Sequence, residues 1–109
     1  MKVYISVDME GIAGVSHHDP TGRDDREYPA AVQLMTGEAN AAVAGAFDGG
    51  ATEVLVNDSH AGMHNLDQLA LDPRATLLQG QKAWSMVAGA GPDRDFGVAL
   101  FVGYHARAG

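Results

Sequence analysis

The sequence contains no cysteine, and this absence limits the kinds of site that the protein can carry. Without cysteine the chain has no disulfide framework and no thiolate metal site. A bound metal would be held by histidine, aspartate or glutamate, a ligand set that suits zinc, manganese or magnesium. Cations are also few, because seven Lys and Arg stand against fourteen Asp and Glu, for a formal net charge of −7. This balance argues against nucleic acid as a partner, since phosphate binding needs clustered cations.

Long apolar stretches are missing as well, so we expect neither a signal-peptide core nor a membrane span. The expected location is therefore the cytoplasm, with no membrane partner. The chain has 109 residues, of which 46% are hydrophobic, and this is the size and composition of one small globular domain. The sequence has no phosphate-binding loop, dinucleotide-binding fingerprint or serine-hydrolase elbow.

Short apolar segments alternate with helical and polar segments along the chain. We expect strands at residues 3–7, 52–56, 75–78 and 96–102, and a long loop at residues 12–27. A helix is expected at residues 28–48, where apolar side chains recur at intervals of four, with a bend or restart at Gly37. Residues 84–88 could form a second, short helix. This order predicts an α/β fold with a largely parallel sheet and flanking helices.

Potential metal ligands follow three of the predicted strands. Asp8 and Glu10 follow the first strand, His60 the second and His105 the last. Ligands of parallel α/β sheets bind beyond the carboxyl ends of the strands, so we expect these side chains to meet at one edge. On an extended strand Asp8 and Glu10 would project to the same side with α-carbons about 6.6 Å apart, and a divalent cation would offset their repulsion. The joint placement favours a metal site over solvated acids and hydrogen-bonded turn histidines.

Neighbouring polar residues are weaker candidates for a metal site. Asp58 and Asn57 are predicted to orient a ligand or to contact the substrate rather than to coordinate metal. The His-His-Asp segment at residues 17–19 favours a solvated loop, since adjacent side chains point in different directions. The lack of a helical pattern argues against a ligand pair formed by His60 and His64.

Three segments resemble the N-terminal signature segments of the DppA-type D-aminopeptidase family, and a fourth, on the predicted helix, is similar too. They occur in the family's order and span essentially the whole chain: Ser6–Gly11, Val56–His60 and Gly103–Ala106, with Met35–Asn40 on the helix. The resemblance implies a two-zinc peptidase that removes N-terminal D-amino acids from short peptides. It also implies self-association, since members form large ring-shaped homo-oligomers.

The resemblance further implies a role for each candidate ligand. Asp8 would bridge both zinc ions, Glu10 and His60 would complete the first site, and His105 would contribute to the second. The family's domain continues past Gly109, and the family's further glutamate ligand and catalytic histidine lie in that continuation.

Residues 1–109 are therefore expected to be the N-terminal part of a single α/β metallopeptidase domain. This part would supply a nearly complete first metal site and only half of the second. We expect the 109-residue chain to bind some zinc, to have little peptidase activity and to expose apolar surface around residues 96–102. The alternative is a non-catalytic metal-binding or oligomer-forming module. A phosphatase is ranked lower, because Arg107 is the one cation close in sequence to the expected site.

Overall fold

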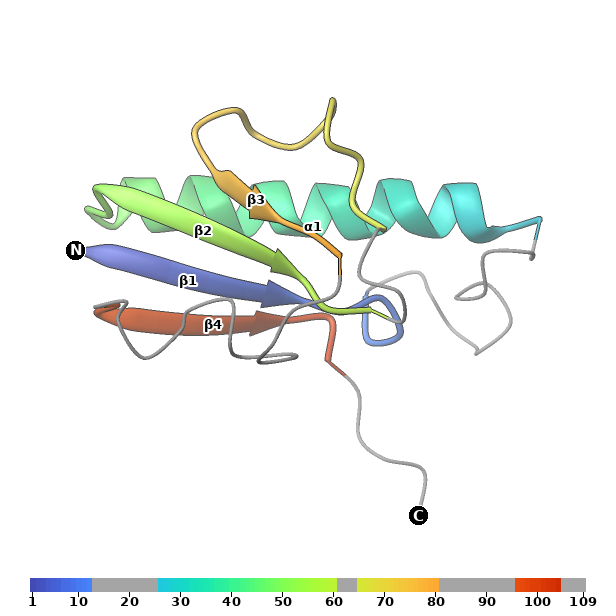
Figure 1. The fold of residues 1–109 in the computed structure, drawn as a ribbon, viewed down its shortest axis with the longest axis horizontal. Helices are drawn as coiled ribbons and strands as arrows, with labels where there is room; N and C mark the ends of the chain where they lie inside the picture. Colours follow the sequence, from blue (N-terminus) through green and yellow to red (C-terminus); the bar gives the residue numbers. More distant parts are fainter. Residues whose placement is uncertain (13–25, 61–64, 81–95, 105–109) are drawn as a thin grey trace, which may run out of the picture.

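The computed structural model describes residues 1–12, 26–60, 65–80 and 96–104. These residues form a four-stranded parallel sheet of order β3-β2-β1-β4 with a long helix against it (Figure 1). The elements are β1 (Lys2–Val7), α1 (Tyr28–Asp48), β2 (Glu53–Asp58), β3 (Thr76–Leu78) and β4 (Val98–Val102). The predicted α/β fold with a parallel sheet is confirmed.

Helix α1 lies along one face of the sheet and runs antiparallel to the strands (Figure 1). Pro29 occupies its first turn, where a missing N–H costs nothing, and Gly49 follows its last residue. The predicted apolar stripe is buried in the core against β1 and β2 at intervals of four, at Ala31, Met35, Ala39 and Val43. Within the described ranges, neither α1 nor any other helix has the length and apolar character needed to cross a bilayer.

Strand β1 is buried on both faces, as a central strand of a parallel sheet should be. Val3, Ile5 and Val7 belong to the core that includes α1. Tyr4 and Ser6 alternate with them and therefore point to the opposite face, where both are also buried.

Strand β2 continues two residues past its predicted end at Val56, through Asn57 and Asp58. Asn57 pairs with Ser6 and Asp58 with Val7 in the parallel register with β1. Both side chains are buried and make hydrogen bonds. Polar side chains are tolerated in a buried strand when they have such partners.

The other predicted boundaries are close to the observed ones where the structure describes them. β3 begins one residue and β4 two residues later than predicted. The proposed short helix at residues 84–88 and most of the predicted loop, at residues 13–25, lie outside the described residues.

Strand β4 exposes the apolar surface that the sequence predicts for this region. Val98, Leu100 and Phe101 are 37%, 36% and 54% exposed, and β4 forms one edge of the described sheet. The central strands β1 and β2 are far better covered, with most of their residues buried.

Helix α1 runs without interruption through Gly37, so the predicted restart is wrong. A Cβ added at Gly37 would have no atom within 4 Å. We therefore expect Gly37→Ala to raise the free energy of unfolding by about 1 kcal/mol, because alanine loses less backbone entropy in a helix. Urea denaturation checks this. A loss of stability would mean that the open space beside Gly37 is filled in solution.

Candidate metal centre

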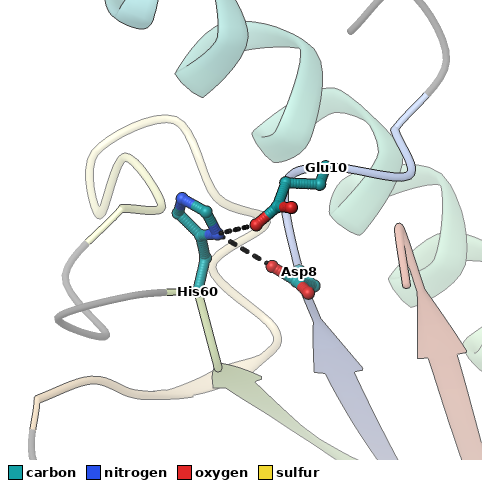
Figure 2. A group of neighbouring side chains, drawn as sticks. All are labelled: Asp8, Glu10 and His60. Carbon is teal, nitrogen blue, oxygen red and sulfur yellow. Dashed lines mark hydrogen bonds and ion pairs between the residues drawn. The ribbon is translucent and has the colours of Figure 1, made fainter. Parts of the chain in front are cut away.

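The carboxyl ends of β1 and β2 lie side by side, because the two strands pair in parallel register up to Val7 and Asp58. The residues that follow these strands bring Asp8, Glu10 and His60 together (Figure 2). One potential ligand atom from each residue lies within 4.8 Å of the other two. The convergence that the sequence predicts for these three side chains is present in the structure.

His60 lies between the two carboxylates. Its Nδ1 atom is 2.9 Å from Asp8 Oδ1 and 3.6 Å from Glu10 Oε1 (Figure 2). The side chains of His60 and Asp8 are only 6% and 5% exposed, whereas that of Glu10 is 24% exposed. The cluster is therefore shielded from water around Asp8 and His60 and accessible at Glu10.

Asp8 and Glu10 follow β1 in the polar turn that the sequence indicates after residue 7, so the spacing considered for an extended strand does not apply to them. β1 ends at Val7, and the N–H of Ile12 donates to the Met9 carbonyl at 3.1 Å. Asp8 Oδ1 accepts a 2.7 Å bond from the Met9 N–H, a local bond that aspartate commonly makes in turns. The turn still directs both carboxylates toward His60.

This turn packs closely against the end of β4. The N–H of Asp8 donates to the Val102 carbonyl at 2.9 Å, and that of Gly11 donates to the Gly103 carbonyl at 2.8 Å. A Cβ at Gly11 would lie 2.3 Å from the Tyr104 carbonyl oxygen, and one at Gly103, where φ is +71°, would lie 2.1 Å from the Asp8 carbonyl oxygen. Only glycine permits this approach, which fixes the acidic turn relative to β4.

Asp58 is fully buried and holds the chain that follows His60. Its Oδ2 accepts bonds from the N–H groups of Asn65 and Leu66 at 2.5 and 2.7 Å and from Gln79 Nε2 at 3.0 Å. Asn65 Nδ2 donates both to Asp58 Oδ1 at 3.0 Å and to the His60 carbonyl at 2.6 Å. These bonds suit the predicted orienting role of Asp58, which would act on His60 through Asn65.

Asn57 lies on the sheet face opposite α1. It is fully buried, and its Nδ2 donates to Ser6 Oγ at 3.5 Å. Sequence reasoning identified Asn57 as an orienting or substrate-contacting candidate, and its burial favours the orienting alternative. It did not identify Asn65, since an isolated asparagine in a loop carries no pattern.

The remaining sequence candidates lie outside the described residues. They are His105, His64, Arg107 and the segment at residues 17–19. The described chain near β4 ends at Tyr104, directly before His105. The assignment of His105 as a ligand of a second ion therefore stays a prediction.

The chemistry of the cluster fits a divalent metal ion. Two carboxylates and one imidazole are ligand types that zinc takes, at distances of about 2.0–2.2 Å. Such distances require ligand atoms to lie roughly 3–4 Å apart, so small side-chain rotations from the present separations would be enough. Two adjacent carboxylates, one of them buried, are also the arrangement that a cation stabilises.

Comparisons with known proteins agree on one family. A family model described as D-aminopeptidase matches residues 1–109. A D-aminopeptidase of Bacillus subtilis (strain 168) is 50% identical over 109 residues, covering 99% of this chain and 39% of the relative. The solved structure of the Zn-dependent D-aminopeptidase DppA from Bacillus subtilis, described as a self-compartmentalizing protease, matches with a TM-score of 0.87 and 52% identity. This match covers 99% of the present chain and 39% of the chain in the solved structure.

Proposed function

The chain belongs to the D-aminopeptidase family, and we propose that it carries part of a zinc site that hydrolyses short peptides with an N-terminal D-amino acid. The convergence of Asp8, Glu10 and His60 at the carboxyl edge of the sheet is the observation that carries this proposal. The chain spans 39% of the length of the relatives that it matches, so the activity of a whole protein is part of what is proposed.

The described residues would hold one zinc ion. His60 would coordinate through Nδ1, the ring atom that faces both carboxylates, and Asp8 and Glu10 would each offer a carboxylate oxygen. Zinc supplies Lewis-acid chemistry, polarising a carbonyl and making water acidic enough to attack near neutral pH. The partly exposed Glu10 carboxylate marks the side from which a peptide with a free α-amino group would approach.

A second zinc ion is proposed between Asp8, acting as a bridging ligand, and His105. Two protein ligands leave such a site underfilled, because catalytic zinc sites keep three beside the reactive water. The family resemblance assigns the missing ligand and a catalytic histidine to sequence beyond Gly109. We also propose that the protein is cytoplasmic and assembles into homo-oligomers, and the description of the matched structure as a self-compartmentalizing protease supports the assembly.

A fusion of residues 1–109 to the remaining part of the Bacillus subtilis relative tests the proposal. We expect the zinc-loaded fusion to hydrolyse D-alanyl dipeptides faster than their L-alanyl counterparts, because half of the residues in the exchanged segment are identical. Release of free alanine measures the rate, and the intact relative is the positive control.

A folded, zinc-loaded fusion that lacks activity beside an active relative would contradict the proposed function. Zinc uptake by residues 1–109 alone would in that case support the alternative of a non-catalytic metal-binding module. Activity that persists after removal of zinc by a chelator would show that the metal assignment is wrong.

A further inference from the structure

Three hydroxyl groups meet on the sheet face opposite α1, next to the candidate metal centre. The Tyr104 hydroxyl lies 2.5 Å from Ser6 Oγ and 2.9 Å from Ser59 Oγ, and the two serine oxygens lie 3.3 Å apart. We call Ser6, Ser59 and Tyr104 the hydroxyl cluster. Ser6 and Ser59 are buried, so these bonds form where water cannot easily replace them.

Each member of the hydroxyl cluster belongs to a different strand end. Ser6 is in β1, Ser59 directly follows β2 and Tyr104 follows β4. Ser59 is tied to β1 a second time, because its N–H and its Oγ both donate to the Val7 carbonyl, at 2.9 and 2.8 Å. The Tyr104 ring is fixed by an edge-on contact with Phe101, with 5.3 Å between centroids.

The hydroxyl cluster also adjoins every segment that carries a proposed ligand. Ser59 directly precedes His60, and Ser6 lies two residues before Asp8. Tyr104 follows Gly103, whose carbonyl accepts the N–H of Gly11 in the acidic turn. Movement of the Tyr104 side chain would therefore be transmitted to the spacing between the Asp8 carboxylate and the His60 imidazole.

We propose that Tyr104 is a positioning residue of the metal site, whose hydroxyl sets the spacing of Asp8 and His60 by linking Ser6 to Ser59. Zinc needs its ligand atoms at about 2.0–2.2 Å, so errors of a fraction of an ångström in that spacing weaken binding. This inference rests on the proposed function, because it assumes that the cluster of Asp8, Glu10 and His60 binds zinc.

The test is Tyr104→Phe in the 109-residue chain, which removes the hydroxyl and keeps the ring against Phe101. We expect the zinc dissociation constant, measured by calorimetry, to rise about tenfold, as it does when outer partners of metal ligands are lost. The visible absorption spectrum of the Co²⁺-loaded variant should also change, because it reports the geometry of the ligands. The control is Tyr4→Phe, which removes a hydroxyl from a buried tyrosine two residues before Ser6.

The control should keep the zinc affinity and the Co²⁺ spectrum of the unchanged chain, even if both variants lower the unfolding temperature equally. An unaltered affinity and spectrum in Tyr104→Phe would overturn the positioning role, and so would equal changes in Tyr4→Phe. If Tyr104→Phe does not fold, Ser6→Ala removes the other end of the 2.5 Å bond and is judged by the same criteria. If the unchanged chain takes up neither zinc nor Co²⁺, the proposed function fails and the positioning role fails with it.

Discussion

Replacing Asp8 with asparagine is expected to weaken zinc binding by at least about 100-fold, since a lost ligand costs more than a lost outer partner. Asp8 is the most central of the three proposed ligands, buried and 2.9 Å from His60 Nδ1. Asparagine keeps the shape of the side chain and an oxygen that can accept the Met9 N–H bond. The turn should therefore survive while the negative charge that attracts the cation is lost. Calorimetric titration with zinc measures the effect, and circular dichroism verifies folding.

Asp67→Asn is the matched control for this substitution. Asp67 Oδ1 also accepts local backbone bonds, from the N–H groups of Leu69 and Ala70, but Asp67 does not belong to the metal cluster. Its replacement should leave zinc affinity unchanged. An Asp8→Asn variant that binds zinc nearly as well as the unchanged chain would show that Asp8 is not a ligand.

The parallel sheet could be predicted from the sequence because its strands are short, continuously apolar runs separated by a helix-length pattern. Residues 3–7 and 54–56 carry that signal without ambiguity, and both form buried strands. The last two residues of β2 could not be predicted in the same way. Asn57 and Asp58 have the composition of a turn, but as strand residues they bond to groups outside β2: the Asn57 amide donates to Ser6 Oγ, and Asp58 accepts the N–H of Leu66.

The approach of Asp8 and Glu10 to His60 was predictable, because parallel strands end at the same edge of a sheet. The path of the chain that brings them there was not predictable. Asp8 and Glu10 reach His60 from a turn, whose path depends on the contact of Gly11 and Gly103 across about ninety residues of sequence. Contacts of that kind leave no periodic signal in a single sequence, and the same holds for the bond between Tyr104 and Ser6.

Replacing Asp58 with alanine is expected to lower the free energy of unfolding by about 3–5 kcal/mol, the largest loss of stability that we predict. The variant would leave three groups that now donate to Asp58 Oδ2 without that acceptor: the N–H groups of Asn65 and Leu66 and the Gln79 side-chain amide. Each buried donor left unsatisfied costs roughly 1–3 kcal/mol. Urea denaturation of the metal-free chain measures the change, so that loss of zinc binding does not enter it.

Asp67→Ala separates this effect from the general cost of removing an aspartate that accepts backbone bonds. Asp67 accepts two such bonds, but at a more exposed position, where water can replace the missing oxygen. We therefore expect a loss of about 1 kcal/mol or less for Asp67→Ala. Asp58→Ala should also release Asn65, which donates to the His60 carbonyl, and so weaken zinc binding in any fraction that stays folded. Equal losses of stability in the two variants would show that the buried bonds of Asp58 add nothing beyond an ordinary turn, and its orienting role would then lack a physical basis.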